Sequence, residues 1–138
     1  MANAIYPLYK QSLLAGDANS DLDTDTATDG VYAALVDTGT YTYSAAHQFY
    51  SSLSGIVGTP QRITSPTVTS GVLDGADVTY TAVSGATSEA IVLYRQNAGA
   101  DTTWRLVAFI DTGVTGLPVT PNGGDIGITW NASGIFAL

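Results

Sequence analysis

Few side chains of this sequence could carry out acid–base chemistry near neutral pH. His47 is the single histidine, Glu89 is the single glutamate, and there is no cysteine. Because histidine is the side chain whose unperturbed pKa lies closest to neutrality, an acid–base enzyme would use His47 or a pair of carboxylates. The Gly-x-Ser-x-Gly turn of many serine hydrolases is absent. We therefore interpret His47 as a structural or interface residue and expect no catalytic residue, no metal ligand set and no cofactor.

Residues 17–29 carry five aspartates and are the place where a cation could bind. The stretch DLDTD at residues 21–25 resembles the start of an EF-hand calcium loop. A loop that begins at Asp21 would need glycine at position 26 and glutamate at position 32, where the chain has Thr26 and Tyr32. We expect a solvated loop, dispensable for folding because only Leu22 could join a core. The alternative is a weak divalent-cation site that carbonyl oxygens or a neighbouring subunit complete.

The elements that position these residues begin with a short helix. Its apolar stripe, at helical spacing, consists of Ile5, Leu8, Tyr9 and Leu13. Pro7 suits the first helical turn, and Gly16 suits the position just after a helix end. This pattern predicts a helix within an N-terminal arm, which we assign to residues 1–16.

After residue 30 the sequence is typical of β-structure. Residues 31–37 are apolar on both faces, which predicts a central strand, whereas Pro66 places residues 61–68 at a sheet edge. Alternation and β-branched residues predict further strands at 77–83, 88–96, 103–111, 125–131 and 134–138. Short strands separated by turns predict a mainly β fold, a single antiparallel β-sandwich or barrel-like domain with a short N-terminal helix. The chain is thus one domain, with arm 1–16, acidic loop 17–30 and β domain 31–138.

The strongest hairpin signal is the pair of strands on either side of the turn after Gln96. We expect Gln96 to pair with Thr103. This register sets Tyr94 opposite Arg105 and gives each arginine of the hairpin an aromatic neighbour, as in cation–π contacts.

The charge balance argues against nucleic acids as partners. The 138 residues include 12 acidic and four basic side chains, so the net charge is −8. Proteins that bind DNA or RNA neutralise phosphates with lysine and arginine, which are scarce here. No apolar run approaches the ~20 residues that cross a bilayer, and the N-terminus lacks the basic and apolar regions of a signal peptide. We expect no nucleic-acid partner, no membrane and synthesis in a cytoplasm.

Tyrosine is over-represented among the aromatic residues, with eight tyrosines against three phenylalanines and two tryptophans. Tyrosine is enriched in protein interfaces and also lines sugar sites, so it does not by itself choose between a protein and a glycan partner. A third explanation for the many tyrosines is that they are ordinary half-buried residues of strands. The candidate interface residues are Ile5, Tyr6, Leu8, Tyr9, Tyr41, Tyr43, His47, Phe49 and Tyr50.

Several stretches of the sequence are distinctive when taken together. They are ALVDT at residues 34–38, YTYS at 41–44, AHQF at 46–49, DVTYTAVSG at 77–85, EAIVLY at 89–94 and GLPVTPNGGDI at 116–126, with TW at 129–130. The start MANA, with Tyr6, Tyr9 and the helix end LLAG, belongs to the same pattern. Over nearly the whole chain this resembles a family of small structural proteins encoded by tailed bacteriophages. Residues 17–29 depart from it, because a shorter and less acidic connection is expected there.

The resemblance implies a protein of the virion, assembled in the host cytoplasm, with no catalytic residue. We expect a capsid decoration (cement) protein that stabilises the head by binding the major capsid protein. Because capsid lattices offer threefold positions and soluble homo-oligomers favour cyclic symmetry, we expect it to associate with itself, as a trimer. The alternative is a tail-associated or fibre module that binds a host receptor or glycan. A hydrolase that uses His47 is a third class.

Overall fold

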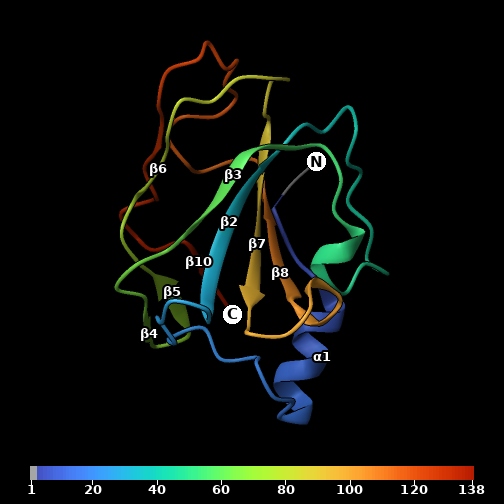
Figure 1. The fold of residues 1–138 in the computed structure, drawn as a ribbon. Coiled ribbons are helices and arrows are strands. Elements are labelled where there is room, and N and C mark those ends of the chain that lie inside the picture. Colours follow the sequence, from blue (N-terminus) through green and yellow to red (C-terminus); the bar gives the residue numbers. More distant parts are fainter. Residues whose placement is uncertain (1–2) are drawn as a thin grey trace.

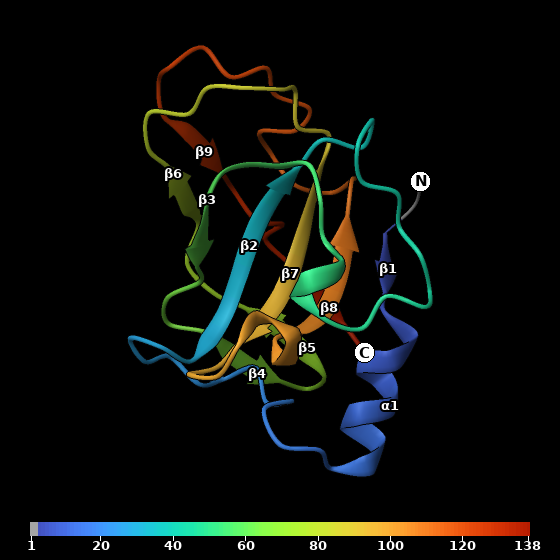
Figure 2. The same cartoon turned by 45° about the vertical axis from the view of Figure 1, so that its right-hand side comes forward.

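The structure is a computed structural model that describes residues 3–138 as three antiparallel sheets (Figure 1 and Figure 2). The strands of the largest sheet are, in order, β1 (Ala4–Ile5), β8 (Arg105–Ile110), β7 (Ala90–Gln96), β2 (Gly30–Val36) and β3 (Ile56–Arg62). A second sheet has the order β10 (Phe136–Ala137), β5 (Val72–Asp74) and β4 (Thr67–Thr69). The third consists of β6 (Val78–Tyr80) and β9 (Ile126–Ile128). The helices are α1 (Pro7–Ala15) and two 3₁₀ turns, η1 (Tyr50–Ser52) and η2 (Asp101–Thr103).

The expectation of a mainly β, antiparallel fold with a short N-terminal helix is confirmed. Within residues 3–138 no sheet closes on itself, so the barrel-like alternative does not apply. One hydrophobic core joins the sheets. Tyr80 of β6, which is fully buried, donates a hydrogen bond from its hydroxyl to the carbonyl oxygen of Ala33 in β2, at 2.8 Å. This contact ties the smallest sheet to the largest.

The central strand that residues 31–37 predict is β2. It pairs with β7 on one side and β3 on the other, and its residues 33–36 are completely buried, so both faces are covered. β9 shows the predicted alternation, since Ile126 and Ile128 are buried and Gly127 is exposed. β3 and β4, which lie on either side of Pro66, are both edge strands.

The predicted N-terminal helix is confirmed as α1. It begins at Pro7, and Gly16 follows its last residue with φ +69°, a left-handed conformation that glycine adopts without strain. Ile5 does not belong to the helix but pairs with Ala108 as part of β1.

The N-terminal arm packs on the large sheet instead of projecting from it. The backbone N–H of Tyr6 donates to the carbonyl oxygen of Val107 at 3.0 Å, and the side chains of Tyr6 and Tyr9 belong to the core. Figure 2 shows β1 at the edge of the sheet, leading directly into α1. Residues 1 and 2 of the predicted arm lie outside the described residues.

The predicted register of the β7–β8 hairpin is wrong. Arg95 pairs with Arg105, which is one residue from the expected alignment. The physical reason is η2, which takes residues 101–103 into the turn, so that β8 begins only at Arg105. A β-bulge shifts the pairing by one more residue, because Val107 has no partner between the pairs Tyr94–Leu106 and Leu93–Ala108.

The two arginines of the hairpin therefore do not have the aromatic neighbours that the predicted register gave them. The guanidinium carbon of Arg105 lies 5.8 Å from the centre of the Phe49 ring. Arg95 is 2% exposed, and its guanidinium group binds Asp21.

Candidate functional site

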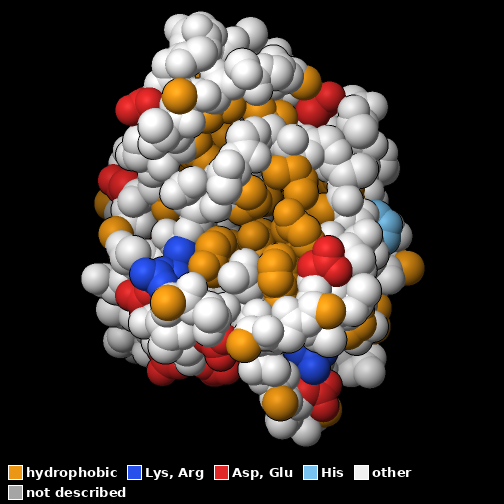
Figure 3. Space-filling model, viewed as in Figure 1, with side chains coloured by type: hydrophobic (Ala, Val, Ile, Leu, Met, Phe, Trp, Pro, Cys, Tyr) orange, Lys and Arg blue, Asp and Glu red, His pale blue; other side chains and the backbone are white. Residues whose placement is uncertain are grey.

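The acidic residues 17–29, here called the acidic strap, are held to the large sheet by three ion pairs. Asp17 pairs with Arg105 at 3.8 Å. Asp21 pairs with Arg95 at 3.0 Å, and Asp25 pairs with Arg62 at 3.0 Å. Figure 3 shows acidic side chains at the lower end of the molecule, where Figure 1 shows the strap, and basic side chains beside them.

The sheet register places the three arginines at the same end of the large sheet. Arg105 of β8 lies opposite Arg95 of β7, which lies opposite Val31 of β2. The next residue of β2, Tyr32, lies opposite Arg62 of β3. Because paired residues share a face and successive residues alternate, Arg105 and Arg95 lie on one face of the sheet and Arg62 lies on the other. Aspartates spaced four residues apart in the strap pair with them in turn.

Asp21 and Arg95 form the most buried of these pairs. The Arg95 side chain is 3% exposed and that of Asp21 is 45% exposed. The Nε–H of Arg95 also donates to the backbone carbonyl of Asp21, at 2.7 Å. Burial alone would raise the pKa of Asp21, but hydrogen bonds from Thr24 and the positive charge of Arg95 outweigh it, and the pKa is lowered.

The strap also contributes uncharged groups to the interior. Leu22 and Ser20 are buried, and the hydroxyl of Tyr9 donates to the carbonyl oxygen of Ser20 at 2.6 Å. The hydroxyl of Ser20 donates to that of Ser12 in α1 at 3.1 Å. Most side chains of residues 17–29 are exposed, as expected for a solvated loop, but Ser20 is buried in addition to the expected Leu22. That the loop is dispensable for folding stays a prediction. Among residues 3–138, no group of three or more potential ligands is placed to hold a metal ion.

An apolar groove of about 280 Å³ lies between α1, the strap and the three-stranded sheet. Its apolar lining consists of Tyr9, Leu13, Leu22, Val68, Leu73, Phe136 and Leu138. Val68 is 53% exposed and Leu138 is 63% exposed. Asp21 and Asp23 of the strap also line it, so the groove has an acidic margin.

The candidate interface residues divide into two groups. Tyr6, Tyr9 and Tyr41 are at most 2% exposed, so their side chains belong to the core of the single chain and not to its surface. The other six are partly exposed, and their place in an interface stays a prediction: Ile5, Leu8, Tyr43, His47, Phe49 and Tyr50.

The buried tyrosines are joined by hydrogen bonds. The hydroxyl groups of Tyr6 and Tyr41 are 2.7 Å apart, and the Tyr41 hydroxyl lies 2.9 Å from Nδ1 of His47. Burial raises the pKa of Tyr6 and Tyr41. His47 therefore has a contact within the chain, and its interpretation as a structural or interface residue stays a prediction.

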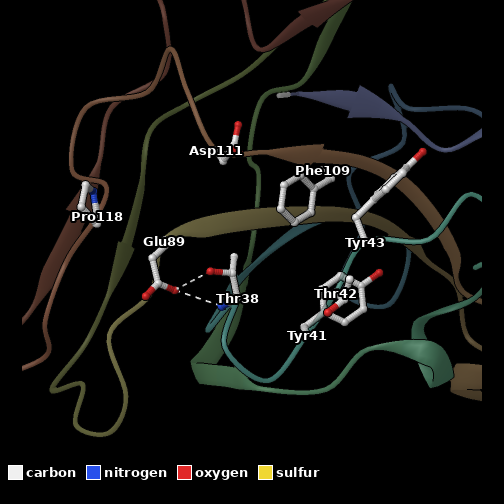
Figure 4. A pocket seen from close by; sticks show the side chains of 8 residues that line it. All are labelled: Thr38, Tyr41, Thr42, Tyr43, Glu89, Phe109, Asp111 and Pro118. Carbon is white, nitrogen blue, oxygen red and sulfur yellow. Dashed lines mark hydrogen bonds between the residues drawn. The ribbon is translucent and has the colours of Figure 1, made fainter. Parts of the chain in front are cut away.

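A second cavity, of about 420 Å³, lies at the opposite end of the large sheet. Figure 4 shows it between Glu89, Thr38 and Pro118 on one side and aromatic side chains on the other. It lies where β2 ends, β7 begins and β8 ends. Its lining residues are Thr38, Tyr41, Thr42, Tyr43, Glu89, Phe109, Asp111 and Pro118.

Neither the groove nor the cavity was predicted from the sequence. The four-residue spacing of Asp17, Asp21 and Asp25 was visible, but these aspartates meet arginines of three separate strands only once the sheet is assembled. The exposed apolar residues of the groove come from β4 and the C-terminal end, which no local pattern joins.

Comparisons with known proteins do not assign this chain to a family. No protein-family model matches it, and no curated protein matches it. In the part of the chain that the structure describes, no helix is long and apolar enough to cross a membrane.

Proposed function

We propose that this chain is a structural protein of a bacteriophage virion, a decoration protein that docks on the major capsid protein through the apolar groove. The sequence stretches that resemble small phage structural proteins suggest the class. Docking is supported by the position of the exposed apolar side chains.

Among residues 3–138, the large hydrophobic side chains that are exposed are Leu14, Val68 and Leu138. Val68 and Leu138 line the groove, whereas Leu14, which is 91% exposed, lies outside it. Contiguous apolar surface of this kind typically marks a protein contact. A decoration protein needs such a surface, because each copy is held by a modest interface of its own.

The charge around the groove favours a basic partner. Asp21 and Asp23 border it, and three of the four basic side chains of the chain already pair with the strap. A second copy of the chain would therefore bring acidic surface to an acidic margin. This favours a different protein as the partner. An apolar side chain of that partner would fill the groove, and a lysine or arginine of the partner would lie beside it. Association with itself as a trimer stays a separate prediction.

Two measurements test this proposal. Quantitative mass spectrometry of purified virions should find the protein in hundreds of copies, as expected for decoration of a head, whereas a few copies would favour the tail alternative. Purified protein should also cosediment with capsids that lack it. Failure of the wild-type protein to bind such capsids would contradict docking.

The groove is tested by the double variant Val68→Ser and Leu138→Ser, with Ala86→Ser as the control at an exposed loop position outside it. Both variants should keep the melting temperature of the wild type. The double variant should bind capsids at least about tenfold more weakly, a loss of ~1.4 kcal/mol, while the control binds normally. Equal binding of all three proteins would show that the groove is not the contact.

A further inference from the structure

We propose that the cavity at the far end of the large sheet binds a neutral saccharide, with one pyranose ring between Glu89 and the aromatic side chains. This site is independent of capsid docking, because the groove is formed by α1, the strap and the three-stranded sheet and shares no lining residue with the cavity. Its volume of about 420 Å³ falls in the range of small-ligand pockets.

Glu89 is the polar side chain that would orient the ligand. Its Oε2 accepts hydrogen bonds from the backbone N–H of Thr38 at 2.9 Å and from the Thr38 hydroxyl at 3.2 Å. Figure 4 shows this pair of bonds. They fix the carboxylate, while Oε1 has no hydrogen bond to any residue from 3 to 138. A fixed carboxylate oxygen is a strong acceptor for sugar hydroxyl groups, because hydrogen bonds to charged acceptors are stronger than neutral ones.

Tyr43 supplies a surface for the apolar C–H face of a pyranose, since Phe109 and Tyr41 are each 2% exposed and lie behind it. Tyr43 and Phe109 pack edge to face, with ring centres 5.8 Å apart. Tyr43 also packs on the buried Tyr6 at 5.0 Å, so the ring of Tyr43 is held in place before a ligand arrives. Tyr43 is itself half-buried, and an aromatic ring with a polar tip suits a ligand that is apolar on one face and polar at its rim.

The charges and hydroxyl groups of the lining select the ligand class. Glu89 and Asp111 line the cavity and no lysine, arginine or histidine does, which disfavours phosphate, sulfate and acidic sugars. The hydroxyl groups of Thr42 and Tyr43 make no hydrogen bond to any described residue. Hydroxyl groups both donate and accept, as sugar hydroxyls do, whereas an ammonium group only donates.

The test is NMR titration of the ¹⁵N-labelled full chain with neutral hexoses: glucose, galactose, mannose, N-acetylglucosamine and N-acetylgalactosamine. Arginine and choline, titrated in parallel, represent cationic ligands. At least one hexose should shift the amide signals of Thr38, Thr42, Tyr43 and Glu89 in a saturable way. If only the cations shift these signals, or if no hexose does so at millimolar concentration, the proposal is wrong.

Variants separate the cavity from other acidic sites. Glu89→Gln keeps the shape of the side chain but removes its charge, and it should weaken hexose binding at least tenfold. Asp101→Asn changes an exposed carboxylate at the opposite end of the sheet and should leave binding unchanged. Should Glu89→Gln fail to fold, Tyr43→Phe, which removes only a hydroxyl group, should weaken binding severalfold. Unchanged affinity in a folded Glu89→Gln variant would overturn the assignment.

Discussion

The two ends of the large sheet use their acidic side chains in different ways. At the end where β8 begins, three aspartates of the strap pair with three arginines on separate strands. At the other end, Glu89 is fixed by Thr38, and one of its oxygens has no partner among residues 3–138. The first arrangement holds a segment in place, whereas the second leaves an acceptor available in a cavity.

This difference shows why net charge alone says little about function here. A charge of −8 includes carboxylates that belong to the structure and carboxylates that border open surfaces. The paired aspartates connect distant parts of the chain and, through Leu22 and Ser20, bring the strap against the core. Asp23 at the groove and Glu89 at the cavity help to define what could approach these two surfaces. Variants at the two ends should therefore affect different properties.

The largest effect is expected from Asp21→Ala, which removes the carboxylate from the buried guanidinium group of Arg95. We expect a loss of about 2 kcal/mol in the free energy of unfolding, less than for a fully buried pair because Asp21 is half-exposed. Urea unfolding of the two proteins measures this difference.

The matched control is Asp23→Ala, two residues further along the strap, where the side chain is exposed and forms no ion pair with a described residue. Its stability should remain within about 0.5 kcal/mol of the wild type. If both variants lose the same stability, the pairing of Asp21 with Arg95 is not what holds the strap.

A smaller effect is expected at the cavity end from Tyr41→Phe. This change leaves the fully buried hydroxyl of Tyr6 without its partner, which should cost about 1 kcal/mol. Tyr43→Phe is the control, because the Tyr43 hydroxyl has no hydrogen bond to a described residue. Thermal unfolding should show a lower midpoint for Tyr41→Phe alone. Equal midpoints for the two variants would show that the hydrogen bond between Tyr6 and Tyr41 does not stabilise the fold.

The smallest effect is the pH dependence of the strap. The pKa of Asp21 is lowered in the folded protein, so its contribution to stability is complete above the unfolded pKa of about 3.9. That contribution is lost as the pH falls through the lower, folded pKa. The stability difference between wild type and Asp21→Ala should therefore be constant near neutrality and shrink in acid. A difference that stays constant however far the pH is lowered would contradict this linkage.

The parts of the fold that follow from local patterns could be predicted from the sequence. Alternation predicts β9, a two-sided apolar run predicts β2, and Pro7 with Gly16 predicts both ends of α1. The β7–β8 register could not be predicted, because it depends on η2 and on the bulge at Val107, neither of which has a distinct hydrophobic pattern.

The sites were harder to predict than the strands because they combine distant residues. Tyr6 and Tyr9 are in an apolar stripe, but whether such a stripe faces a partner or the chain's own core depends on the sheet beside it. Asp21 and Arg95 are 74 residues apart in sequence. The cavity joins the ends of three strands with Tyr43 and Pro118 from two loops, a combination that strand pairing creates.

The most direct test of docking through the groove is hydrogen–deuterium exchange of the protein, free in solution and bound to capsids. If the groove is the contact, amides of residues 66–73 and 134–138 should become protected on the particle. Amides of residues 38–43 and 116–120, at the cavity end, should exchange as they do in solution. Protection confined to the cavity end, with the groove unchanged, would contradict docking through the groove.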